Sequence, residues 1–162
     1  MVDAALAVVR LQPLHNGHKL LIESMLNAAK TALIGIGSAN KSDDRNPYSY
    51  EQRKEMVEAV FKERVAVFAL DDIGATSKRA WAEYVLKKIT LEGLPKPDLY
   101  FAGSQEDSSW FYNLLEVVIV DRFTVGKKIS ATAIREGGMS DQIPPEVIKI
   151  IASFPKTRTK SV

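Results

Sequence analysis

Two histidines stand three residues apart, at His15 and His18, in the segment 10–18, which reads RLQPLHNGH. They are the only histidines in the sequence, and Arg10 opens the same segment. Imidazole and guanidinium groups donate hydrogen bonds to phosphate oxygens, so these residue types favour chemistry on a phosphorylated substrate. Gly17 lets the backbone approach a ligand closely. The alternative, a surface loop with two solvated histidines, accounts less well for this grouping.

A second group of polar side chains lies near the other end of the chain, where segment 127–135 reads KKISATAIR. Ser130 or Thr132 can cap a short helix there, and Arg135 lies about one turn beyond that helix start. By itself this segment is most simply a capped surface helix with a solvated arginine. Together with segment 10–18 it predicts two anion-binding sites that face each other, because a ligand with several phosphates needs donors on both sides.

Short apolar runs and helical patterns alternate along the chain and must position these groups. We expect strands at residues 4–9, 32–37, 65–70, 99–102 and 117–120. We expect helices at about 18–30, 50–61, 77–89, 107–114, 130–137 and 145–153, the second of them with a capping box of Ser49 and Gln52. The helix expected from residue 18 directs its positive end at the histidine loop.

This order of elements predicts one α/β domain over residues 1–162. We expect a single Rossmann-like, doubly wound and mainly parallel five-stranded sheet, with helices on both faces and a small helical C-terminus. Ligands bind at the carboxyl ends of such strands. The loops after Val9, Ile36, Leu70 and Ala102 therefore lie on the expected functional edge.

The composition excludes several kinds of protein. Cysteine is absent, which excludes disulfides and thiolate sites, and two histidines make a structural zinc site unexpected. The net charge of +2 is too small to make nucleic acid or a membrane surface the main partner. Segment 1–3 does not read as a secretory signal, and no apolar run approaches the length that spans a bilayer. We therefore expect a soluble cytoplasmic domain.

These segments resemble the signatures of the nucleotidylyltransferase superfamily, an H-x-G-H loop and a later I-S-x-T-x-I-R stretch. Segment 10–18 is similar to the R-F-Q-P-x-H-x-G-H stretch of archaeal-type nicotinamide-mononucleotide (NMN) adenylyltransferases. Segments 35–40 (GIGSAN), 45–56 (RNPYSYEQRKEM), 72–81 and 102–104 (AGS) resemble further stretches of that family, in the same order. Lys78 departs from the pattern, since the family tends to place an asparagine there that contacts the nicotinamide amide.

The resemblance implies roles for individual residues. It assigns catalysis to His15, His18 and Arg135. It assigns ATP binding to Arg10, Leu11, Gln12, Gly17, Gly103, Ser130 and Thr132. It assigns acceptor binding to Asn40, Arg45, Asp72 and Trp81. The residues themselves leave alternatives open, because Trp81 can equally pack into the core beside Val85, and Asp72 can simply cap a strand end. Trp110 and Phe111 are expected in the core or in an interface.

The implied reaction moves AMP from ATP to NMN and gives NAD and pyrophosphate, with Mg²⁺ carried mainly by ATP rather than by protein ligands. The alternatives are another phosphorylated acceptor, such as nicotinate mononucleotide or pantetheine phosphate, or CTP as the nucleotide donor. A non-catalytic nucleotide sensor is a third possibility. The resemblance also implies a homo-oligomer, and we expect neither nucleic acid nor membrane as a partner.

Overall fold

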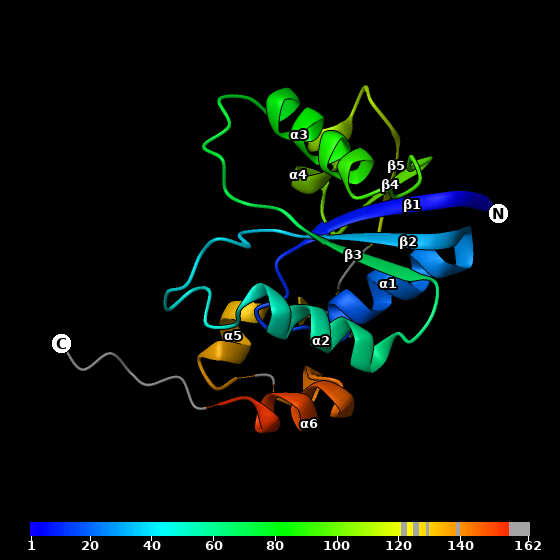
Figure 1. Cartoon of the computed structure of the whole chain (residues 1–162). Helices are drawn as coiled ribbons and strands as arrows, with labels where there is room; N and C mark the ends of the chain where they lie inside the picture. Colours follow the sequence, from blue (N-terminus) through cyan, green and yellow to red (C-terminus); the bar gives the residue numbers. More distant parts are fainter. Residues whose placement is uncertain (121–122, 125–126, 129, 139, 156–162) are drawn as a thin grey trace.

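Five parallel strands form the centre of the computed structural model, which describes residues 1–120, 123–124, 127–128, 130–138 and 140–155 (Figure 1). The strands are β1 (Val2–Val9), β2 (Ala29–Ile36), β3 (Val65–Ala69), β4 (Leu99–Ala102) and β5 (Glu116–Ile119). Their order in the sheet is β3-β2-β1-β4-β5, and every neighbouring pair is parallel. The chain thus begins in the middle of the sheet, builds one side and then crosses to the other, which puts the switch point between β1 and β4.

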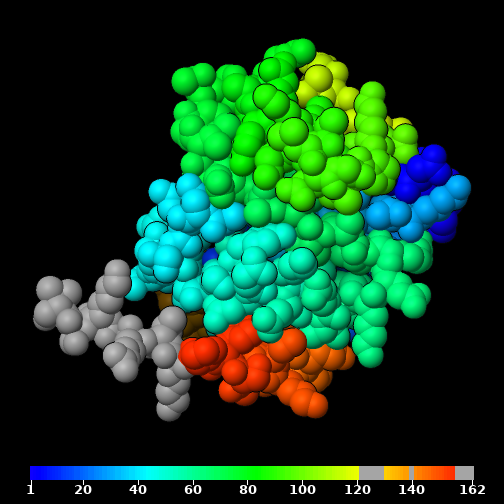
Figure 2. Space-filling view, in the orientation of Figure 1, coloured from blue at the N-terminus to red at the C-terminus, as the bar shows by residue number. Residues whose placement is uncertain are grey.

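Helices cover both faces of the sheet, as expected for a doubly wound fold. The helices α1 (Asn16–Ala28), α2 (Tyr50–Val60) and α6 (Pro145–Ser153) lie on one face, and α3 (Lys78–Leu91) lies on the other with the short α4 (Gln105–Ser108) (Figure 1). Figure 2 shows α6, in orange and red, packed along α2. None of the helices in the described ranges is long and apolar enough to cross a membrane.

The alternation of side chains along β1 builds two cores. Ala5 and Ala7 belong to the core on the α1 face, whereas Ala4 and Leu6 belong to the core under α3. All four are fully buried. This explains why the strand reads as a continuous apolar run, since both of its faces are covered.

All but one of the expected elements are present, and none of their ends differs from the expected position by more than three residues. The capping box of α2 is confirmed, because Ser49 Oγ accepts from Gln52 N–H and Gln52 Oε1 accepts from Ser49 N–H. The single helix expected at 107–114 is wrong. It is replaced by α4 and a 3₁₀ turn, η1 (Ser109–Phe111), where the Ser108 and Ser109 hydroxyls donate to carbonyls three residues back. Such bonds satisfy the last carbonyls of α4 and tighten its final turn.

The C-terminal part contains one feature that the sequence did not indicate. Strands β6 (Phe123–Thr124) and β7 (Lys127–Lys128) form a small antiparallel pair before α5 (Ala131–Arg135). The two lysines of the predicted phosphate-binding segment therefore lie in a strand, and Ile129 falls outside the described residues. A further 3₁₀ turn, η2 (Ser140–Gln142), leads into α6.

Candidate active site

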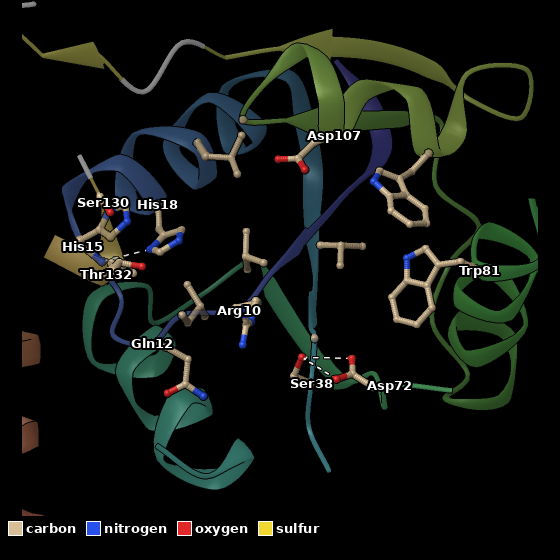
Figure 3. A pocket seen from close by; sticks show the side chains of 18 of the residues that line it. Arg10, Gln12, His15, His18, Ser38, Asp72, Trp81, Asp107, Ser130 and Thr132 are labelled. Atoms are coloured by element: carbon tan, nitrogen blue, oxygen red, sulfur yellow. Dashed lines mark hydrogen bonds between the residues drawn. The ribbon is translucent and has the colours of Figure 1, made fainter. Parts of the chain in front are cut away.

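A cavity of about 720 Å³ opens at the carboxyl ends of β1, β2 and β4, next to the switch point of the sheet (Figure 3). Its volume is in the range of small-molecule sites. It is lined by eleven of the residues assigned from the sequence, namely Arg10, Leu11, Gln12, His15, His18, Asp72, Trp81, Gly103, Ser130, Thr132 and Arg135. Figure 3 shows the imidazoles, Ser130 and Thr132 at one end, Trp81 at the other, and Arg10 between them.

The two imidazoles are held by the backbone at the start of α1. His15 is the N-cap residue, and its Nδ1 accepts a hydrogen bond from Gly17 N–H at 3.0 Å. His18 Nδ1 accepts from His15 N–H at 3.2 Å, which completes a capping box made of two histidines. Because both Nδ1 atoms act as acceptors, each neutral ring carries its hydrogen on Nε2. The two rings are stacked, with centroids 3.8 Å apart and an angle of 23° between their planes.

The histidine loop and α5 meet at one edge of the cavity, although they lie far apart in the sequence. Arg135 Nη1 donates to Gln12 O at 2.7 Å across 123 residues, and Arg135 Nη2 lies 3.4 Å from Thr132 Oγ1. Ser130 caps α5 by accepting from Ala133 N–H at 3.3 Å. The prediction that the two segments face each other is confirmed.

Arg10 is fixed by a loop from another part of the chain. Its Nη2 donates to Asn46 Oδ1 at 2.5 Å, and Asn46 Nδ2 donates to Asp43 Oδ1 at 2.9 Å. Asp43 also accepts the backbone N–H groups of Arg45 and Asn46, and the hydrogen bond from the Asn46 side chain is the main cause that lowers the pKa of its carboxyl. Asn46 is 5% exposed, so its amide is a buried bridge between a carboxylate and the cavity arginine.

The Asp72 carboxylate lines the cavity near Trp81 and is oriented by the end of β2 (Figure 3). Ser38 Oγ lies 3.1 Å from both carboxylate oxygens and donates to them. Asn40 exchanges two hydrogen bonds with the backbone of Asp72, so it holds this loop from behind. Asp72 is thus a positioned acceptor of hydrogen bonds rather than only the cap of a strand end.

Two indole rings form the wall opposite the histidines. Trp81 and Trp110 both line the cavity, with ring centroids 6.4 Å apart in an edge-to-face arrangement. Trp81 also packs on Tyr84 at 5.3 Å, which means that it is both a core-facing and a cavity-facing residue. Lys78 Nζ donates to Ser109 Oγ at 2.6 Å and lies 5.8 Å from the centre of the Trp110 ring.

Comparison with known proteins agrees with this geometry. The model of the family described as cytidylyltransferase-like matches residues 7–137. The chain belongs to the cytidylyltransferase-like family. It is 32% identical over 158 residues to a nicotinamide-nucleotide adenylyltransferase of Thermococcus sibiricus, covering 90% of this chain and 81% of that protein.

Solved structures of other proteins share this fold. A bifunctional NMN adenylyltransferase/ADP-ribose pyrophosphatase from Francisella tularensis is similar with a TM-score of 0.73 and 24% identity over 90% of this chain. This chain spans only 44% of that longer protein. A structure of that enzyme complexed with AMP and a manganese ion is similar with a TM-score of 0.72 and 25% identity.

Three residues assigned to the family's site do not line the cavity of this member. The Gly17 N–H is used to orient His15, and the Asn40 side chain is used to hold the Asp72 loop. Arg45 is exposed on the loop before α2. A local hydrogen bond explains the difference for Gly17 and a tertiary one explains it for Asn40, whereas a contact of Arg45 with the acceptor stays a prediction.

Other cavity residues were missed from the sequence. Trp110 was expected in the core or in an interface, whereas it lines the cavity while also packing against the α3 core. Phe111, its neighbour, is fully buried as expected. Asp107 and Tyr100 line the cavity beside Gly103, and burial, with a smaller effect of Asp107, raises the pKa of Tyr100. No spacing signal distinguishes such residues, because each lies in a short element whose orientation depends on the fold.

Proposed function

We propose that this chain is an adenylyltransferase that transfers AMP from ATP to nicotinamide mononucleotide, giving NAD and pyrophosphate. The supporting observation is the contact of Arg135 with Gln12 O, which brings two groups of phosphate-binding residues to one cavity. The 32% identical relative from Thermococcus sibiricus carries the name of this activity. The division of the cavity into a histidine end and an indole end matches a donor and an acceptor nucleotide (Figure 3).

The reaction needs positioned cations and hydrogen-bond donors rather than a protein nucleophile. A phosphate oxygen of the acceptor attacks the α-phosphorus of ATP, a new P–O bond forms, and the bond to the bridging oxygen breaks. Pyrophosphate leaves with that electron pair. Because the nucleophile is already an anion, the barrier lies in bringing two anions together and in stabilising the charge that develops on the phosphates.

The cavity residues fit these needs at its histidine end. We assign the Nε2–H groups of His15 and His18 to the α- and β-phosphates, where charge builds as the bond breaks. Arg135 and Thr132 hold the β- and γ-phosphates, and Arg10 screens the repulsion between donor and acceptor. Gln12 supports this end, since its side chain exchanges hydrogen bonds with the Tyr48 backbone and its carbonyl accepts from Arg135.

The indole end fits an acceptor that carries a flat ring. We assign the face of Trp81 to the pyridine ring of the mononucleotide, whose positive charge suits an aromatic surface. Asp72 accepts a hydrogen bond from a polar group of the same substrate. Arg45 is assigned to the acceptor phosphate.

A divalent cation fits this site through the nucleotide. No group of three or more His, Cys, Asp or Glu side chains that could hold a metal ion occurs among the residues that the structure describes. In the proposed reaction the triphosphate and water would supply most of the ligands for Mg²⁺. When bound, the ion neutralises charge on the phosphates. Asp107 and Asp72 are the carboxylates that line the cavity and could contact its water shell.

Pyrophosphate release by the purified protein tests the assignment. The panel combines each nucleotide donor, ATP or CTP, with each of three acceptors: NMN, nicotinate mononucleotide and pantetheine phosphate. We expect the highest kcat/KM with ATP and NMN. Pyrophosphate release only with another donor–acceptor pair rejects NMN or ATP as the substrate and retains nucleotidyl transfer. Nucleotide binding without pyrophosphate release from any pair indicates a sensor. The expected homo-oligomer is checked separately by light scattering.

A further inference from the structure

A buried arginine behind the cavity is not used by the chemistry above. Arg53 lies in the first turn of α2, and its side chain is 0% exposed. Its Nη1 donates to Arg10 O at 2.9 Å and to Gly37 O at 2.7 Å, and its Nη2 donates to Ser38 O at 3.2 Å. The Nε atom donates to Ser49 O at 3.2 Å. One guanidinium therefore joins the ends of β1 and β2 to the start of α2.

Three of these carbonyls belong to residues that line the cavity, namely Arg10, Gly37 and Ser38. Arg10 is the first residue after β1, so a bond to its carbonyl fixes where its side chain leaves the backbone. Ser38 has a positive φ of 51°, a conformation that a residue with a side chain adopts only when its surroundings hold it. The Ser38 hydroxyl in turn orients Asp72. Arg53 thus reaches both the phosphate side and the acceptor side of the cavity.

The arrangement is unusual because a buried cation binds only backbone. Within the described ranges no carboxylate lies within ion-pair distance of Arg53. Burial, and to a lesser extent the nearby Arg10, lowers its pKa to about 10. A buried charge without a counter-ion is costly, and an apolar residue would fill the same space at lower cost. An apolar residue, however, has no hydrogen-bond donors, whereas the planar guanidinium donates to carbonyls of three separate segments.

We propose that Arg53 is a positioning residue of the active site, which sets the backbone of Arg10 and Ser38 and, through the Ser38 hydroxyl, the carboxylate of Asp72. The expected effect on turnover rests on the proposed adenylyl transfer, whereas the expected effect on the backbone of Arg10 and Ser38 does not. Lysine keeps the charge and loses the planar fork, so it cannot hold these carbonyls together.

The test compares Arg53→Lys and Arg53→Ala with a matched control, Arg64→Ala. Arg64 also donates only to backbone carbonyls, those of Leu26, Ala29 and Lys30, but at the opposite end of the sheet. We expect Arg53→Lys to lower kcat on the order of 10²-fold, since a small misplacement of reacting groups has such an effect. Added guanidinium, well below denaturing concentration, should restore much of the kcat of Arg53→Ala and none in the control.

Amide hydrogen exchange gives a result that does not depend on activity. The N–H groups of Gly37 and Ala39 donate to Val9 O at 2.8 Å and to Leu70 O at 2.9 Å, so they report on the end of β2. We expect both amides to exchange faster in Arg53→Lys and unchanged in Arg64→Ala. Unchanged exchange in folded Arg53→Lys overturns the positioning role, whatever the activity. If the wild-type protein shows no adenylyl transfer but both amides exchange faster in Arg53→Lys, the proposed function is rejected and the positioning role of Arg53 stands. If Arg53→Ala does not fold, Arg53→Lys decides both points.

Discussion

His18 has two functions in this structure that three substitutions can separate. Its Nδ1 accepts the backbone N–H of His15 and so caps α1, and its Nε2–H is the donor that we assign to the phosphates. His18→Ala removes both functions. His18→Gln retains both, because a glutamine at the same helix position caps α2 in this protein, where Gln52 Oε1 accepts from Ser49 at 3.0 Å. His18→Glu retains the cap and replaces the donor with an anion.

The magnitudes follow from these contacts. Loss of a donor to developing charge lowers kcat by about 10²–10³, or roughly 3–4 kcal/mol, and this loss applies to His18→Ala and His18→Glu. Loss of the cap lowers the free energy of unfolding by about 1 kcal/mol, and this loss applies to His18→Ala alone. His18→Gln should keep the stability of the wild type and the highest activity of the three. Stability and turnover therefore rank the variants differently.

Three measurements check this ranking. Urea unfolding gives the stability, pyrophosphate release gives kcat and KM, and calorimetric titration with ATP gives the affinity. We expect ATP affinity to change far less than kcat in His18→Ala, because the contact strengthens in the transition state. A kcat that falls in proportion to stability across the series would refute the separate donor role of His18. A loss in His18→Ala that is entirely a loss of ATP affinity, at unchanged kcat, would refute that role as well.

Three further substitutions test other parts of the site and core. Asn46→Ala releases Arg10, and since a hydrogen bond to a charged group contributes about 1.5–3 kcal/mol, kcat/KM should fall at least tenfold in the release assay. Trp81→Ala should raise the KM of the acceptor about tenfold and leave the KM of ATP unchanged, whereas Trp81→Phe should keep most of the affinity because it keeps an aromatic face. An acceptor KM that does not respond to either change contradicts this assignment. Gly35→Ala should lower the free energy of unfolding by about 1–3 kcal/mol in urea, because the new Cβ would lie 2.6 Å from Leu70 Cδ1 in a filled core. An unchanged free energy of unfolding would show that the side chains around Gly35 shift to accept the extra methyl group.

Substrate specificity depends on how the indole end is built. Lys78 stands where the resembling family tends to place an asparagine, and its amine is bound to Ser109 and faces Trp110 instead of lining the main cavity. If the acceptor binds as proposed, its ring meets Trp81 and Trp110, which line the cavity, rather than a polar amide donor from this position. Aromatic contact selects a flat ring but distinguishes an amide from a carboxylate poorly. The comparison of NMN with nicotinate mononucleotide is thus the informative part of the acceptor panel.

The sequence by itself determined the elements and the two reactive segments. Continuous apolar runs predicted the five parallel strands, because a strand covered on both faces needs apolar side chains at every position. Segments 10–18 and 127–135 were identified because imidazoles, guanidinium groups, hydroxyls and a glycine are grouped within a few residues. Because parallel strands end on the same side of the sheet, the sequence also placed the loop after Val9, which carries the two histidines, on the functional edge.

Only the tertiary structure decided which of these side chains act and which hold others in place. Asn46 bonds to Arg10 across 36 residues, and Arg53 bonds to Arg10 O across 43. Neither pairing follows from spacing, because the partners come together only when separate loops pack against the same strand ends. Trp110 was expected away from the cavity but lines it, whereas Asn40 was expected in the site but holds the Asp72 loop from behind. The spacing of apolar residues predicts which face of a helix or strand is buried. Which residues contact that face depends on how the whole chain folds.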